Sequence, residues 1–303
     1  MPCVADDCRA KAGAFAYGNR AAATDDATPS KCVQELSKRT RYAIIPSSMA
    51  EIFVVGSACG FPVSGRGHSS LLLSVLDRSV LIDAGEPCSR SLIEAGLPVN
   101  SIDAVLLTHG HADHTGGLPM LIQSLWLSQR ESPLTIFLPE ELSKPLQRWL
   151  DAIYLGPAFM PFELKFVAWE TQQFFEEFGL KIYPRETTHL RSLYEKFAPR
   201  RFRSYSLRIE HSDFRLVLSG DLGWPTDLES QLGNPVDLLV SELAHFPPRE
   251  LFRFLGRREV RKLLLTHLAP ELLDNLQSVI RDAREDLPQT LAILANDGLR
   301  VSF

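Results

Sequence analysis

The sequence predicts an α/β fold, and two features of the chain lead to this prediction. Short apolar segments rich in β-branched and aromatic residues alternate with segments whose apolar residues recur at helical spacing. Side chains that suit metal binding follow several of the apolar segments directly. Because loops at strand ends display functional groups well, we expect an α/β domain with its active groups at the ends of its strands.

The first expected strands are close together in the sequence. Residues 51–56 form an apolar, β-branched run, and residues 69–76 and 79–82 form two more, separated by a turn. The glycine-rich residues 57–67 could cradle a phosphate, but they lack the Lys-Ser/Thr ending of a P-loop. A hairpin connection is therefore the preferred interpretation of this loop.

The rest of the chain alternates between expected helices and strands. Helical spacing of apolar residues predicts helices at residues 89–95, 118–129 and 142–155, and the last of these has a lid over the active site as its alternative role. Residues 172–178 are expected to form a short helical or turn segment. Further strands are expected at residues 102–107, 134–138, 162–167, 180–183, 214–220 and 260–266.

Length and composition indicate an ordinary globular protein. The chain has 303 residues, of which 45% are hydrophobic and 23% charged, so a sizeable core is available. A formal net charge of −5 argues against a broad nucleic-acid-binding surface. Residues 1–48 show little hydrophobic periodicity and are expected to form a loose extension before a domain at residues 49–303, with Met49 as a conceivable alternative start.

Cysteine usage and the absence of long apolar runs predict a cytoplasmic protein that does not enter a membrane. The five cysteines are an odd number, contain no Cys-x-x-Cys pair and lie away from the histidines, as reduced cysteines do. A second metal site at Cys3, Cys8 and Cys32 is a weaker alternative, since no histidine lies nearby. No apolar run reaches the length of a membrane span or resembles a signal peptide.

A dense group of metal-binding side chains follows the expected strand at residues 102–107. His109, His111, Asp113 and His114 lie within six consecutive positions, so a tight turn can direct them into one small volume. Imidazole and carboxylate ligands together suit zinc and similar divalent ions. Chance clustering is the alternative, but it rarely adds a carboxylate in this order.

Three more candidate ligands, His189, Asp221 and His267, lie after strands farther along the chain. His267 ends a Leu-Leu-Thr-His run like the one that ends at His109, and Asp221 follows a strongly apolar strand. Each has a simpler interpretation as a surface or hydrogen-bonded residue, and a Gly-Asp step is commonly a turn. Since a closed two-metal centre needs more ligands than the first group supplies, these residues are the best candidates to complete it.

These motifs, in this order, resemble those of the metallo-β-lactamase-fold hydrolases from about residue 50 to the C-terminus. The resemblance implies an αββα four-layer sandwich made of two similar halves. It also implies two divalent metal ions, most consistent with zinc, with manganese or iron as alternatives. In that arrangement His109, His111 and His189 would hold one ion, Asp113, His114 and His267 would hold the other, and Asp221 would bridge them.

Within that group the chain is most similar to the ribonuclease Z-like and phosphodiesterase branch. His245 lies 22 positions before His267, a spacing similar to that of the branch's extra active-site histidine, which is thought to protonate the leaving group. An imidazolium beside the metals can supply the proton that a departing alkoxide needs. A structural histidine at a helix start is the alternative. Glu242 either orients His245 or is an ordinary strand-end charge, and Asp113 is expected to hold or deprotonate the attacking water.

The expected substrate is a small anion. A basic run between residues 185 and 203 could clamp phosphate oxygens, and Arg203 with Ser204 is the preferred clamp, although a solvated charged loop is the alternative. Arg66, in the first glycine-rich loop, is a further candidate for substrate binding. The long basic arm of the tRNA-processing members has no counterpart between residues 139 and 166, so transfer-RNA maturation is not expected.

The predicted function is therefore hydrolysis of a small or nucleotide-like phosphodiester by a hydroxide that bridges two metal ions. A nucleotide or an RNA end would be the partner, and a homodimer is left open. A thioester or lactone hydrolase is one alternative, because the same hydroxide attacks carbonyl carbon equally well. A non-catalytic protein that uses the fold only to hold a metal or ligand is another.

Overall fold

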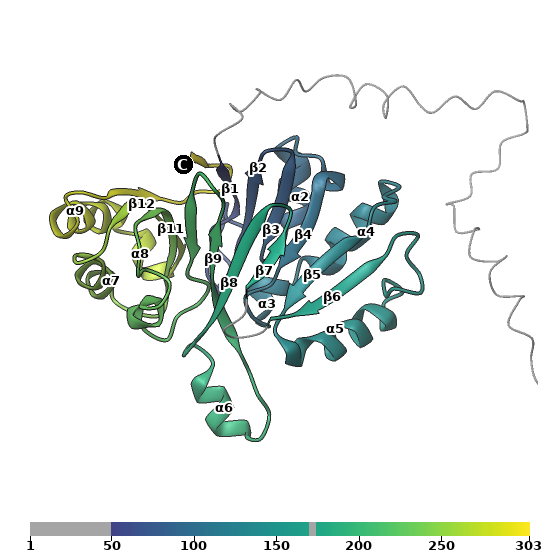
Figure 1. Ribbon diagram of the computed structural model, residues 1–303. Coiled ribbons are helices and arrows are strands. Elements are labelled where there is room, and N and C mark those ends of the chain that lie inside the picture. The colour runs from purple at the N-terminus through teal and green to yellow at the C-terminus, as the bar shows by residue number, and fades with distance from the viewer. Residues whose placement is uncertain (1–49, 170–173) are drawn as a thin grey trace, which may run out of the picture. The chain divides into compact units, whose positions relative to one another are not determined.

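The computed structural model describes residues 50–169 and 174–303, which form two β-sheets lying face to face (Figure 1). The predicted extension at residues 1–48 and the alternative start at Met49 lie outside the described residues. In spatial order the first sheet contains β14 (Arg300–Ser302), β1 (Glu51–Gly56), β2 (Ser70–Val75), β3 (Arg78–Ile82), β4 (Ile102–Leu106), β5 (Leu134–Leu138) and β6 (Leu164–Ala168). The second contains β13 (Leu291–Leu294), β12 (Val260–Leu268), β11 (Val236–Leu243), β10 (Arg215–Leu218), β9 (Ser204–Glu210), β8 (Leu180–Thr187) and β7 (Phe175–Glu177).

The two sheets have the same plan, with an antiparallel part followed by a parallel part. Strands β14, β1, β2 and β3 pair antiparallel, and β3 through β6 pair parallel. In the second sheet β7 through β10 pair antiparallel, and β10 through β13 pair parallel. Because the carboxyl ends of parallel strands share one edge of a sheet, the loops that follow β4, β10, β11 and β12 are brought to such edges.

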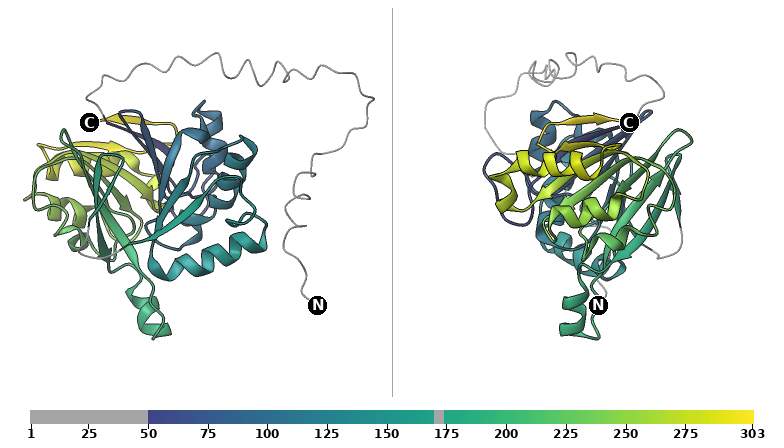
Figure 2. Two further views of the ribbon diagram at one scale, coloured as in Figure 1. Left: turned by 45° about the vertical axis from the view of Figure 1, so that its right-hand side comes forward. Right: turned by 90° about the vertical axis from the view of Figure 1, so that its left-hand side faces the viewer.

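The inner faces of the sheets form one core, and helices cover the outer faces. Val54 and Leu106 of the first sheet belong to the same buried cluster as Leu207 and Leu264 of the second. Outside the first sheet pack α2 (Cys88–Glu94), α4 (Leu118–Leu127) and α5 (Glu140–Ala152), and outside the second pack α7 (Pro248–Leu255) and α9 (Leu276–Asp286), as Figure 2 also shows. The predicted αββα four-layer sandwich is therefore confirmed.

Short helical segments complete the described ranges. They are η1 (Val99–Ser101), α3 (Ala112–Thr115), α6 (Arg191–Phe197), η2 (Pro225–Leu228) and α8 (Pro270–Leu273). The helix α6 lies in a projection between β8 and β9 that extends away from both sheets (Figures 1 and 2). Residues 139–166 contain α5 and the start of β6 and form no such projection. None of the helices in the described ranges combines the length and apolarity needed to cross a bilayer.

Most elements lie within a few residues of their predicted positions, and three differences stand out. Residues 170–173 lie outside the described part, but Phe175–Glu177 forms β7, so the helical or turn expectation for this stretch is wrong. Its pairing with β8 through the turn at Gly179, where φ is +75°, decides the conformation. Strand β8 continues to Thr187 instead of ending at Tyr183, β9, β13 and β14 were not predicted, and β11 was implied only by the strand-end alternative for Glu242.

Candidate metal centre

All seven predicted ligands lie at one edge of the sandwich, in loops, at strand ends or, for Asp113 and His114, in the short helix α3. The loops after β4, β8 and β10 supply His109, His189 and Asp221. The end of β12 supplies His267. Their ligand atoms fall into two neighbouring groups, each with its members within 4.8 Å of one another. The first group is His109, His111, His189 and Asp221, and the second includes Asp113, His114 and His267.

The first group consists mainly of imidazole nitrogens that face one another. Nε2 of His109 lies 3.0 Å from Nδ1 of His111, and Nε2 of His189 lies 3.3 Å from the same atom. Burial lowers the pKa of His109 well below its ordinary value, so that this imidazole stays neutral. Neutral imidazole is the form that binds a metal ion, and three such rings converging on one point suit a divalent cation.

Asp221 stands between the two groups. Its Oδ2 atom lies 3.7 Å from Nε2 of His109 and 3.6 Å from Nε2 of His189, while its Oδ1 atom lies 3.3 Å from Nε2 of His114 and 3.7 Å from Nε2 of His267. Burial alone would raise the pKa of this carboxyl, but the surrounding imidazoles, His267 first, hold the pKa well below its usual range. Each carboxylate oxygen therefore faces one group, which is the placement that a bridging ligand requires.

The second group contains a buried nitrogen that lacks a hydrogen-bond partner. Within the described residues, Nε2 of His114 makes no hydrogen bond, although it is buried among Asp113, Asp221 and His267. A buried polar atom without a partner is costly, and a metal ion would satisfy it. Together with the histidine and aspartate donor set, this orphaned atom shows that the residues present fit divalent metal ions.

Backbone conformation also positions the ligands. Gly220 precedes Asp221 with φ at +55°, and a Cβ atom there would lie 2.4 Å from the carbonyl oxygen of Tyr205, so only glycine fits. His267 itself has φ at +49°, a conformation that non-glycine residues rarely adopt. Such conformations persist where the surrounding structure enforces them, and they gather at functional sites.

One supporting residue was missed by the sequence prediction. Asp83, at the end of β3, is 3% exposed, and its Oδ2 atom lies 2.7 Å from Nδ1 of His114. Its Oδ1 atom accepts a hydrogen bond of 2.7 Å from the backbone N–H of Thr108, just before His109. The signal was present in the sequence, because Asp83 follows an apolar strand in the same way as Asp221 does.

His245 lies beside the two groups and is held by a buried carboxylate. Its ring centroid is 4.5 Å from that of His189, and its Nε2 atom is 3.9 Å from Oδ2 of Asp221. Its Nδ1 atom lies 2.8 Å from Oε1 of Glu242, which is 1% exposed and also accepts a backbone N–H from Leu222. Burial lowers the pKa of His245, but the hydrogen bond and charge of Glu242 outweigh it and raise the pKa overall.

The predicted substrate-binding residues are not gathered at the centre. Ser204 is fully buried, and its hydroxyl donates to the backbone carbonyl of Asp221, so it has no access to a substrate. Nη1 of Arg203 lies 3.4 Å from Oε2 of Glu140. We therefore correct the expectation that Arg203 and Ser204 clamp the substrate. Ser204 supports the loop that carries Asp221, and Arg203 is held by the acidic side chain of Glu140.

Arg66 is also engaged by structural partners. Its guanidinium donates to the hydroxyl of Ser57 at 2.7 Å, to the backbone carbonyl of Ala295 at 2.9 Å and to the side-chain oxygen of Asn296 at 2.6 Å. These bonds tie the loop of residues 57–67 to the chain before β14. That loop forms the hairpin connection between β1 and β2 that its sequence favours.

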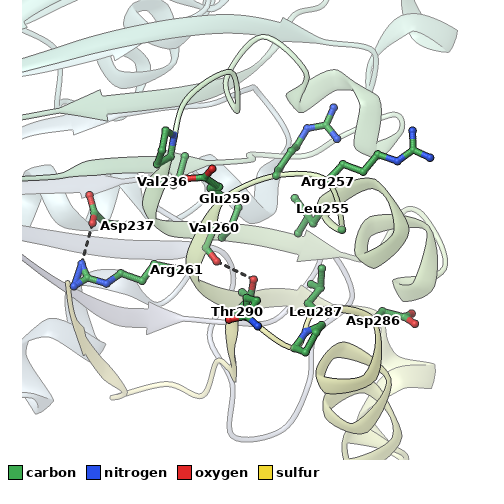
Figure 3. Close-up of a pocket in the computed structure, with 15 residues that line it drawn as sticks. Val236, Asp237, Leu255, Arg257, Glu259, Val260, Arg261, Asp286, Leu287 and Thr290 are labelled. Carbon is green, nitrogen blue, oxygen red and sulfur yellow. Dashed lines mark hydrogen bonds and ion pairs between the residues drawn. The ribbon is translucent and has the colours of Figure 1, made fainter.

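Two pockets in the described part of the chain differ in their position relative to the centre. One of about 340 Å³ lies at the base of the α6 projection, next to His189, and its lining includes Thr188, Arg191, Tyr194 and Arg201. Another of about 590 Å³ lies at the start of β11 and β12, where Val236 and Val260 line it (Figure 3). The second pocket is at the opposite ends of the strands whose carboxyl ends carry the candidate ligands, so it is separate from the centre.

Comparison with known proteins places the chain in a family. Residues 78–268, more than half of the chain, match the family model described as the beta-lactamase superfamily domain. This range contains every candidate metal ligand as well as Glu242 and His245. The chain therefore belongs to the beta-lactamase superfamily domain family.

Among curated proteins the chain is similar to ribonuclease Z of several organisms, which confirms the expected resemblance. It is 34% identical over 125 residues to ribonuclease Z of Lachnospira eligens, covering 41% of this chain and 40% of that protein. It is 31% identical over 142 residues to ribonuclease Z of Metallosphaera sedula, covering 47% and 46%. The chain thus matches less than half the length of these relatives.

Solved structures share the fold over most of this chain. The metallo-beta-lactamase fold protein YhfI from Bacillus subtilis superposes with a TM-score of 0.70 at 20% identity, over 84% of this chain and 100% of that one. The short form of human tRNase Z superposes with a TM-score of 0.62 at 18% identity, over 83% and 98%. At these identities the likeness concerns the fold alone.

Proposed function

We propose that this chain is a divalent-metal-dependent phosphodiesterase that hydrolyses a small or nucleotide-like phosphodiester. The observation that carries the proposal is the position of His245, an exposed imidazole held by the buried Glu242 beside the two groups of candidate ligands. Such a residue suits a reaction whose leaving group needs a proton. The similarity to proteins named ribonuclease Z supports the same substrate class.

In the proposed centre His109, His111 and His189 would hold one ion, Asp113, His114 and His267 would hold the other, and Asp221 would serve both. Zinc fits this donor set best, with manganese or iron as alternatives. When bound, such ions would lower the pKa of a water molecule and offer positive charge to phosphoryl oxygens.

The proposed catalytic residues of the chain are Asp113, His245 and Glu242. Burial alone would raise the pKa of Asp113, but the neighbouring imidazoles of His114 and His267 lower it overall, so its carboxylate can orient the attacking water or accept its proton. The carboxylate of Glu242 accepts a hydrogen bond from Nδ1–H of His245 and thereby directs Nε2 toward the centre. From Nε2, a protonated His245 would deliver its proton to the departing oxygen.

The pocket at the base of the α6 projection is the proposed place for the rest of the substrate. It adjoins His189 through Thr188 and is lined by Arg191 and Arg201. Arg191 is paired with Glu195 at 2.9 Å, whereas Arg201 makes no ion pair with any residue that the structure describes. Arg203 lines the same pocket, but its guanidinium is paired with Glu140. Because guanidinium groups fit phosphate oxygens, Arg201, which has no such pair, takes the substrate-binding role expected of Arg203.

A side-by-side assay tests the proposal. Purified protein loaded with zinc or manganese is offered bis(p-nitrophenyl) phosphate, a lactone and S-lactoylglutathione. We expect turnover of the phosphodiester and its loss on treatment with a chelator. Faster hydrolysis of the lactone or the thioester would contradict the phosphodiesterase assignment, and full metal loading without any turnover would favour a non-catalytic protein.

A further inference from the structure

Two loops that carry candidate ligands touch each other at the rim of the metal centre. One follows β8 and contains Thr188 and His189, and the other follows β10 and contains Asp221 and Gly223. A Cβ atom on Gly223 would lie 2.1 Å from Oγ1 and 2.8 Å from the carbonyl carbon of Thr188, so the loops pack backbone against backbone. This contact lies one residue from His189 and two from Asp221, whose Nε2 and Oδ2 atoms are 3.6 Å apart.

The carboxylate of Asp227, in η2, joins these two loops. Its Oδ2 atom accepts the backbone N–H of Thr188 at 2.9 Å and the backbone N–H of Gly223 at 2.9 Å. Both of its oxygens also lie within 3.1 Å of the Thr188 hydroxyl. One charged side chain thus accepts hydrogen bonds from both loops, and hydrogen bonds to an ionised acceptor are stronger than those between neutral groups.

On the buried side, other residues hold the backbone of Asp221, whereas the side chain of Thr188 is held from outside. The hydroxyls of Thr187 and Ser204 donate to the backbone carbonyl of Asp221 at 2.7 and 3.2 Å. Thr188 is exposed, and the polar contacts of its side chain run to Asp227. The position of His189 relative to Asp221 therefore depends on the outer contact that Asp227 makes.

We propose that Asp227 is a positioning residue that sets the affinity of the centre for the ion held by His109, His111 and His189. This inference rests on the metal centre of the proposed function. In the described residues Asp227 has no contact with Asp113, His114 or His267, so the second ion depends on it far less. Loss of the hydrogen bonds to Asp227 lets His189 move away from Asp221. This movement weakens the binding of one ion selectively.

Zinc affinity of the Asp227→Asn variant tests this proposal without any activity measurement. The two zinc equivalents are withdrawn stepwise by a chelator and their dissociation constants are compared with those of the wild type. We expect one equivalent to bind about 10- to 100-fold more weakly, as when residues supporting a metal ligand are lost, with little change in the other. Asp237→Asn is the matched control, because Asp237 also accepts a backbone N–H, from Arg215 at 2.9 Å, but lies at the start of β11.

A second variant decides the matter if Asp227→Asn proves unstable. Thr188→Val removes the hydroxyl contacts and leaves Asp227 intact, so a smaller weakening of the same zinc equivalent is expected. Unchanged zinc affinity in a folded variant, or equal weakening of both equivalents, would overturn the positioning role and leave the proposed function standing. A wild-type protein that binds no zinc would overturn the metal centre itself and this inference with it.

Discussion

The Oδ2 atom of Asp83 lies 2.7 Å from Nδ1 of His114, and this contact determines which nitrogen of the imidazole faces the candidate metal centre. A carboxylate can only accept a hydrogen bond here, so Nδ1 carries the donated hydrogen and Nε2 is the nitrogen left for a metal ion. The same carboxylate accepts from Thr108, whose hydroxyl is 3.1 Å from Nδ1 of His109. One buried acidic residue thus orients ligands on both sides of the centre.

Replacing Asp83 by asparagine should weaken metal binding. Asparagine tolerates the positive φ of 55° at this position, but its amide can place an N–H opposite Nδ1 of His114 and favour the wrong tautomer. We expect affinity for zinc to fall about 10- to 100-fold, measured by competition with a chelator. Affinity equal to that of the wild type would show that the tautomer of His114 is set by something else.

Removing His245 should separate catalysis from metal binding. His245→Ala is expected to lower kcat on a phosphodiester about 100- to 10,000-fold, the usual contribution of a general acid, while the metal content stays at the wild-type level. Metal analysis and kinetics on the same preparation measure both. His211→Ala is a suitable control, because His211 lies in the turn between β9 and β10. Unchanged turnover would remove His245 from the mechanism.

The sequence was most informative where local pattern and function coincide. His109, Asp221 and His267 each directly follow or end an apolar strand, so their placement at strand ends follows from hydrophobic pattern alone. The four-layer fold was implied by the family resemblance that these motifs carry. Asp83 fits the same pattern, but it is not part of a cluster of candidate ligands in the sequence. Its role became visible only through its distance to His114.

Pairing between distant strands explains what the sequence could not predict. Ser204 belongs to a basic stretch, and only the register that pairs it with Thr187 reveals that it is buried behind Asp221. The residues of β7 have only a weak intrinsic preference for the strand conformation. They form a strand because β8 provides a pairing partner. Which arginine of the basic stretch is free likewise depends on where Glu140 lies, and that glutamate is 63 residues from Arg203.

Cys88 should make the stability of the protein fall in alkaline solution. Burial raises the pKa of this thiol from its ordinary 9.0 to about 12, so the folded state keeps a proton that the unfolded state loses. Its contribution to stability is present below pH 9 and is lost as the pH rises from 9 toward 12, by about 1.4 kcal/mol per pH unit. Urea unfolding at pH 8, 9 and 10 should show a shallower decline for Cys88→Ala; identical slopes in the two proteins would contradict this.

Arg201 should contribute to substrate affinity more than to the chemical step. Its guanidinium lines the pocket beside His189 and makes no ion pair within the described residues, so it can bind a phosphate or a second anionic group of the substrate. A contact made equally in the ground state and the transition state raises KM when it is removed and leaves kcat unchanged. We therefore expect Arg201→Ala to raise KM for a nucleotide phosphodiester about tenfold, the loss of roughly one charged hydrogen bond.

Arg200→Ala is the matched control for this change, because Arg200 is also exposed and adjacent in sequence but does not line the pocket. If the two variants raise KM equally, the effect is general attraction by positive charge, which should vanish in high salt. A rise in KM for Arg201→Ala that persists at high salt would instead identify a direct contact. Because that contact lies at the base of the α6 projection, it would also show that the substrate extends from His245 across His189 toward the projection.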